Sequence, residues 1–162
     1  MRELLVVSER VAALLKQRKE TVAVAESAAG GLITAALLAV PGASAYCLGG
    51  VVIYTRQAWE AVRDFEEGLL EGHRSATEQN ALIRARIARD RFKATWGIGE
   101  TGAAGPTGNR YGDPAGHAWV AVSGPREQAV RVATGNTERL ANMDAFAAAA
   151  LRLLDESLNA TA

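Results

Sequence analysis

Apolar residues recur at helical spacing in several stretches of the chain. Over residues 4–15 they return every three or four positions, and basic residues follow at 16–19, which predicts a first helix that ends near Arg18. The same spacing predicts a helix over 77–92 and a last helix that ends near Leu158, after a cap at 135–137. The short apolar run at 32–40 predicts a buried helix, ended by a Pro-Gly pair.

Short runs rich in β-branched residues alternate with these helices. They predict strands at 21–25, 49–55 and 94–100, and a hairpin of 117–123 and 126–134 around a Gly-Pro turn. Residues 101–116 are too rich in Gly and Pro for regular structure, and the charged segment 57–72 has room for one short helix. The pattern predicts an α/β fold, a three-layer α/β/α sandwich around a mixed β-sheet, with residues 1–162 as one domain.

Composition narrows the classes of ligand. Eighteen basic residues balance eighteen acidic ones, so the chain lacks the excess of positive charge that would indicate a nucleic-acid partner. The single cysteine, Cys47, excludes an internal disulfide and a cysteine zinc cluster, and we expect it in the core. No apolar run reaches the roughly twenty residues of a membrane span. We therefore expect a cytoplasmic protein with no membrane partner, no metal and no cofactor, which binds a small molecule.

Three segments lie at the ends of predicted strands, at the edge where open α/β sheets bind ligands. These are residues 26–31, 54–56 and 101–106. Ser27, in a turn of small residues, is the best candidate for a nucleophile, although a serine before an apolar run more often caps the helix. Glu26 either orients a ligand hydroxyl or sits in the first helical turn. Gly30 and Gly31 allow either close approach to a ligand or only a tight turn.

The segment 107–117 holds more polar side chains than a plain connection needs. Arg110 in this loop, with Asn109 beside it, and Arg56 after the second strand are candidate contacts to an anionic ligand. His117 is either a base facing Ser27 or a hydrogen-bonded structural residue. The arginines between 84 and 91 are interpreted as the solvated face of their helix.

Three motifs resemble those of one known family. AESAAGG (25–31) is similar to A-E-S-C-T-G-G, GGVVIYT (49–55) to a strand ending in Tyr-Ser, and TGAAGP (101–106) to T/S-G-I-A-G-P. Together they resemble the C-terminal domain of the CinA family, the nicotinamide mononucleotide deamidases. The resemblance implies hydrolysis of a nucleotide carboxamide, with Ser27 as nucleophile and Tyr54 beside it. It also implies a homo-oligomer, and substrate contacts from the glycine-rich segments, including Gly30, Gly31, Thr101, Gly102 and Gly105.

The chain departs from this family at several positions. Trp59 stands where the family has a lysine able to act as a base, and Ala29 and Asp113 replace a threonine and a lysine. Arg139 lies near the position of a further family cation but out of register. Tryptophan accepts no proton. Two alternatives follow: a catalytically silent relative that binds a nucleotide-like ligand or a partner protein, and an enzyme for a different amide whose specificity is set by residues 109–117.

Overall fold

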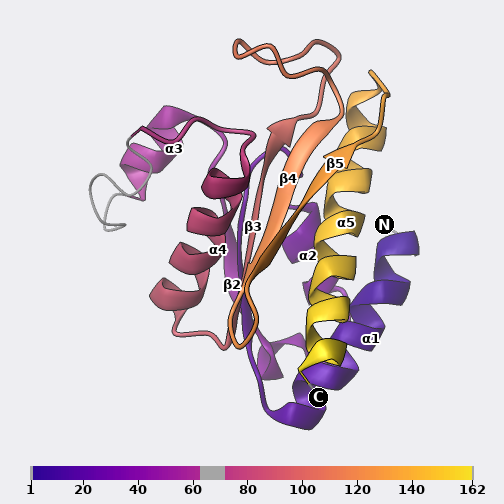
Figure 1. Cartoon of the computed structure of the whole chain (residues 1–162). Helices are drawn as coiled ribbons and strands as arrows, with labels where there is room; N and C mark the ends of the chain where they lie inside the picture. The colour runs from indigo at the N-terminus through magenta and orange to yellow at the C-terminus, as the bar shows by residue number, and fades with distance from the viewer. Residues whose placement is uncertain (1, 63–71, 162) are drawn as a thin grey trace.

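A mixed five-stranded sheet forms the centre of the molecule (Figure 1). The computed structural model describes residues 2–62 and 72–161. The strands are β1 (Val22–Glu26), β2 (Cys47–Val52), β3 (Trp96–Ala103), β4 (His117–Ser123) and β5 (Gln128–Ala133), in the order β2-β1-β3-β4-β5. β1 runs parallel to β2 and to β3, whereas β3–β4 and β4–β5 are antiparallel. The predicted mixed sheet is confirmed.

Helices cover both faces of the sheet (Figure 1). On one face lie α1 (Arg2–Arg18), α2 (Leu32–Leu38) and α5 (Arg139–Ala160), and on the other lies α4 (Glu78–Phe92). A 3-10 turn, η1 (Ala43–Ala45), precedes β2, and the short helix α3 (Arg56–Ala61) follows it. The three-layer α/β/α sandwich is therefore confirmed. Within the described ranges, no helix is both long and apolar enough to cross a bilayer.

Glycines in β3 let α4 approach the sheet closely. A Cβ atom on Gly97 would overlap the carbonyl oxygen of Ala85, and one on Gly99 would overlap that of Ala81. The facing positions of α4 are small and fully buried. Backbone therefore packs against backbone here, and the position of α4 relative to β3 is tightly fixed.

The larger core fills the space between the sheet and the layer of α1, α2 and α5. Its fully buried side chains include Leu15, Ile33, Trp96, Phe146 and Leu154. Cys47 is 6% exposed and belongs to this cluster, as predicted.

Some predicted boundaries differ from the observed ones. β3 continues to Ala103, so the first residues of the predicted 101–116 loop are strand. The N-cap of α5 is Glu138, which makes no side-chain capping bond, and not a residue of 135–137. Of the segment 57–72, residues 63–71 lie outside the described part of the chain, and α3 supplies the short helix.

Candidate functional site

The carboxyl ends of β1, β2 and β3 meet at one edge of the sheet because the three strands are parallel. The backbone N–H of Ile53 donates to the carbonyl of Glu26 at 2.8 Å. Ser27 and Tyr54 are the residues that come next along the chain, so both leave the sheet at this edge. The two residues predicted as the catalytic set thus follow neighbouring strands at the same edge of the sheet.

Ser27 does not cap the following helix. The N-cap of α2 is Gly31, and no side chain of that residue is involved. Ser27 is 8% exposed, and among the described residues its hydroxyl has no hydrogen-bond partner, while its backbone N–H donates to Glu100 Oε2 at 2.8 Å. The interpretation of Ser27 as a helix cap was therefore wrong, and its hydroxyl is left without an internal role.

Glu26 takes the capping role. Its carboxylate accepts hydrogen bonds from the backbone N–H groups of Gly31, Ile33 and Thr34 at 3.0–3.1 Å, and from the Thr34 hydroxyl at 2.6 Å. The side chain is fully buried. Its charge also matches the positive end of the helix dipole. Glu26 is thus a helix cap and not an exposed contact for substrate.

The two glycines of the turn are required by its geometry. Gly30 and Gly31 have φ angles of +67° and +99°, values that side chains with a Cβ rarely adopt. A Cβ atom on Gly30 would lie 2.6 Å from Met143 Cε of α5. The interpretation as a tight turn holds for both residues, and Gly30 also allows close packing against α5.

Arg139, which lies out of register with the family cation in the sequence, reaches the same edge. It donates to the hydroxyl of Tyr54 at 2.8 Å and to the carbonyl of Gly105 at 2.6 Å. These bonds link the ends of β2 and β3 to the first turn of α5. The Tyr54 side chain is exposed, so this pair presents a cation and a phenol to solvent. The sequence alone did not assign Arg139 to the site, because its contact with Tyr54 depends on where α5 begins.

Trp59, which stands at the sequence position of the resembling family's lysine, lies against Arg84 of α4. The guanidinium of Arg84 lies 5.1 Å from the centre of the Trp59 ring and donates to the carbonyl of Ile53 and to Asn80 Oδ1. Arg84 is only 3% exposed, so its assignment to a solvated helix face was wrong. Burial lowers the pKa of Arg84 to about 10, which keeps it charged at neutral pH.

Two expected contacts in β3 are internal to the sheet. Thr101 is fully buried, and its hydroxyl accepts from the N–H of Ala76 at 2.9 Å. Gly102 pairs with Ala118 of β4, and a Cβ atom there would lie 2.5 Å from the Cβ of Ala118. Thr101 therefore has a structural contact, and Gly102 is fixed by sheet packing. Gly105, with φ of +104°, accepts Arg139 through its carbonyl and remains at the site edge.

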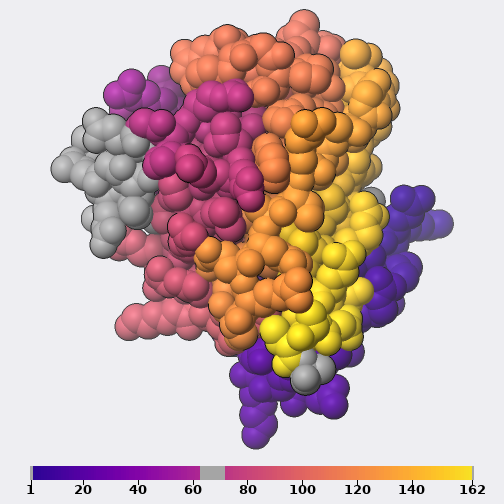
Figure 2. All heavy atoms as spheres, viewed as in Figure 1, coloured from indigo at the N-terminus to yellow at the C-terminus, as the bar shows by residue number. Residues whose placement is uncertain are grey.

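The loop after β3 is organised by its own polar side chains. Asn109 accepts from the N–H groups of Tyr111 and Asp113 and donates to the Asp113 carboxylate. Arg74 also donates to Asp113 at 2.7 Å, and this pairing lowers the pKa of that carboxyl. In the space-filling view the loop forms the top of the molecule, next to the segment before α4 (Figure 2). Asn109 therefore shapes the loop.

The remaining candidates, His117, Arg110 and Arg56, make their polar contacts with residues other than Ser27. His117 Nε2 is 2.9 Å from the carbonyl of Ala76 and 3.8 Å from Asp113 Oδ1, which supports its structural interpretation. Arg110 donates to the Tyr111 hydroxyl within the loop. Arg56 has a 90% exposed side chain and pairs with Glu60 along α3.

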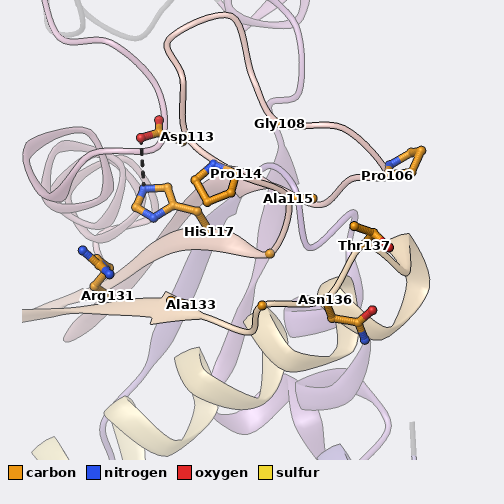
Figure 3. A pocket seen from close by; sticks show the side chains of 12 residues that line it. Pro106, Gly108, Asp113, Pro114, Ala115, His117, Arg131, Ala133, Asn136 and Thr137 are labelled. Carbon is orange, nitrogen blue, oxygen red and sulfur yellow. Dashed lines mark ion pairs between the residues drawn. The ribbon is translucent and has the colours of Figure 1, made fainter.

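A pocket of about 530 Å³ opens between this loop and the segment after β5 (Figure 3). Its lining includes Asp113, His117, Arg131, Asn136 and Thr137. Ser27, Tyr54 and Arg139 do not line it. The pocket therefore borders the edge at Gly105, next to Pro106 and Thr137 of its lining, but Ser27 is not part of it.

Glu100 dominates the electrostatics beneath Ser27. The side chain is fully buried, and burial raises its pKa from 4.5 to about 7. Hydrogen bonds from the N–H groups of Ala29 and Ser27 and the charge of Arg84 oppose this rise, whereas the neighbouring Glu26 adds to it. Glu100 was not among the predicted site residues, although a glutamate inside a strand of apolar and glycine residues was a visible signal.

Known proteins share both the sequence and the fold. Residues 5–158 match the family described as the CinA C-terminal domain. A CinA-like protein of Anaeromyxobacter sp. (strain Fw109-5) is 42% identical over 140 residues, and one of Salinibacter ruber is 38% identical over 137 residues. Each alignment covers 85% of this chain, which spans about a third of the length of these relatives.

Solved structures agree with this assignment. A CinA superfamily protein from Klebsiella pneumoniae has a TM-score of 0.87 at 26% identity, covering 97% of this chain and 98% of its own. The competence/damage inducible protein CihA from Agrobacterium tumefaciens has a TM-score of 0.86 at 28% identity, covering 96% and 95%. On the strength of the sequence match over residues 5–158, this chain belongs to the CinA C-terminal domain family.

Proposed function

We propose that this chain hydrolyses the carboxamide of a small nucleotide-like substrate, of the type of nicotinamide mononucleotide, with Ser27 as nucleophile. One observation carries the proposal: Ser27 and Tyr54 follow directly on Glu26 and Ile53 at the carboxyl edge of the sheet, and the Ser27 hydroxyl has no hydrogen-bond partner among the described residues. A buried turn that leaves one hydroxyl unused is suited to a reacting group. The choice of amide rests on the resemblance to the family.

The reaction divides into two steps. The Ser27 oxygen attacks the amide carbonyl carbon, the C–N bond breaks, and the nitrogen leaves as ammonia with the proton that the hydroxyl gave up. Water then cleaves the ester, which yields the carboxylate product and restores the serine. Tyr54 accepts a hydrogen bond from Arg139, so its own phenolic hydrogen remains available to donate toward the reacting group.

Arg139 supplies a cation for an anionic group of the substrate. Its guanidinium is held by Tyr54 and by the carbonyl of Gly105, so the charge is fixed at the edge before a ligand arrives. A guanidinium matches the geometry of phosphate oxygens. The phosphate of a mononucleotide is the group that we assign to it.

A second candidate, binding without turnover, is favoured by Trp59. Its ring packs against the buried guanidinium of Arg84 in the position of the family's lysine, and neither side chain accepts a proton at neutral pH. A well-placed base is worth about a hundredfold to ten-thousandfold in rate. Under this candidate the edge binds the nucleotide and releases it unchanged.

Ammonia release from nicotinamide mononucleotide separates the two candidates. The proposal expects release by the wild type, loss in Ser27→Ala, and retention in Ser75→Ala, an exposed serine outside the site. Wild-type binding without ammonia, together with release gained in Trp59→Lys, would favour the silent candidate. Release that persists in Ser27→Ala would refute the role of the serine.

A further inference from the structure

Two glutamates lie on neighbouring strands beneath the Ser27 turn, Glu26 at the end of β1 and Glu100 inside β3. Ala25 of β1 pairs with Gly99 of β3, and Glu26 and Glu100 are the next residues of the two strands. Both side chains are fully buried. Glu26 is satisfied by the N-terminus of α2, so four donors surround its carboxylate. Glu100 is placed differently and holds the turn itself.

One oxygen of Glu100 accepts two backbone hydrogen bonds. Oε2 receives the N–H of Ser27 at 2.8 Å and that of Ala29 at 2.9 Å. The other oxygen, Oε1, is buried and has no hydrogen-bond partner among the described residues. A buried carboxylate with half of its acceptor capacity unused is an expensive arrangement for stability alone. The arrangement is explained if its charge has a use.

The surroundings of Glu100 place its ionisation close to neutrality. Burial is the main cause of its raised pKa of about 7, and Arg84 from α4 and Glu26 from β1 are the charged groups that act on it. Arg84 favours the ionised form and Glu26 opposes it. The carboxyl of Glu100 therefore changes its charge near neutral pH, as groups at functional sites often do.

We propose that Glu100 is the positioning residue of the Ser27 turn: its ionised carboxylate holds the N–H groups of Ser27 and Ala29, and loss of its charge loosens the turn that presents the serine hydroxyl. This inference rests on the proposed function, because it assigns Ser27 a reaction to perform. A carboxylate forms about twice as strong a hydrogen bond as a neutral acceptor, so protonation weakens both contacts together.

The first measurement does not depend on catalysis. In amide NMR spectra of the wild type, the N–H protons of Ser27 and Ala29 move together with one midpoint near neutral pH, since they share one acceptor atom. In Glu100→Gln neither signal titrates, while the side-chain carbonyl still accepts both bonds and keeps the turn folded. In the control Glu127→Gln, which alters a glutamate held by Arg86 and Ser123, both signals titrate as in the wild type.

The second measurement is the pH profile of ammonia release. The wild-type kcat/KM rises about tenfold from about pH 6 to pH 8 as Glu100 ionises, whereas the profile of Glu100→Gln is flat to within about twofold. Glu100→Gln keeps an accepting oxygen without the charge, so its activity stays near the level of the protonated wild type, whereas Glu100→Ala removes both bonds and lowers kcat further at every pH in this range.

The outcomes separate this inference from the proposed function. Amide signals that titrate without any substrate hydrolysis would support the positioning role and refute the proposed reaction. Hydrolysis that depends on Ser27, combined with amide signals that stay fixed across this pH range, would support the reaction and overturn the role of Glu100. An unchanged pH profile in Glu100→Gln would overturn it as well.

Discussion

Replacing Glu26 by alanine tests whether this residue is a helix cap. The carboxylate accepts four hydrogen bonds from Gly31, Ile33 and Thr34 and is fully buried. Glu26→Ala leaves these four donors unpaired at the start of α2. The N–H of Ile33 is buried and the other three donors are partly buried, so at about 0.5–1 kcal/mol for each lost bond the expected loss in free energy of unfolding is about 2–4 kcal/mol. That is a large part of the roughly 5–15 kcal/mol available to a domain.

Urea denaturation followed by circular dichroism measures this loss directly. Glu26→Gln retains one accepting oxygen but turns its other group, a donor, toward backbone N–H groups, so we expect an intermediate loss. Glu9→Ala, an exposed glutamate on α1, serves as the control and should change stability by less than about 0.5 kcal/mol. If Glu26→Ala lowered the free energy of unfolding by less than about 1 kcal/mol and weakened nucleotide binding instead, the capping role would be refuted.

Three further predictions concern pH, packing and binding. Burial raises the pKa of Glu100 from 4.5 to about 7, so the folded state keeps a proton that the unfolded chain has lost; the free energy of unfolding should fall between about pH 5 and pH 7, and Glu100→Gln should remove that fall in urea titrations. Gly97→Ala forces a Cβ atom into the carbonyl of Ala85 and should cost about 3 kcal/mol or more in the same assay; a loss below about 1 kcal/mol would contradict the close packing of α4. Arg139→Ala should weaken binding of a nucleoside monophosphate about tenfold by calorimetry, with exposed Arg126→Ala unchanged, and equal affinities in both variants would exclude Arg139 as the phosphate contact.

The arrangement of strands and helices was predictable because it depends on local patterns. Alternation over 117–134 was enough to predict an antiparallel hairpin. Helical patterns such as that over 77–92, which alternate with the strands, were enough to predict a sheet covered by helices. The end of β3 was not, since Gly102 looks like a loop residue until its contact with Ala118 is known. The pairing across β4 therefore decided what the local sequence left open.

The candidate site was only partly predictable, for reasons of tertiary contact. Ser27 follows one predicted strand and Tyr54 lies at the end of another, so the order of the parallel strands places both at one edge of the sheet. Arg84 was assigned to the surface because arginines on a helix are usually solvated, and its burial depends on Trp59 and on the carbonyl of Ile53 far along the chain. Arg139 became visible only when the start of α5 was placed against Tyr54.

Trapping the covalent intermediate is the most direct test of Ser27 as the nucleophile. The wild type is mixed with nicotinamide mononucleotide, quenched in acid within a turnover, digested and analysed by mass spectrometry. We predict an ester adduct, with the mass of the substrate less ammonia, on the peptide that contains Ser27, and its absence in Ser27→Ala. Ammonia release without any adduct on this peptide, or with an adduct on another residue such as Cys47, would contradict the role of Ser27 as nucleophile.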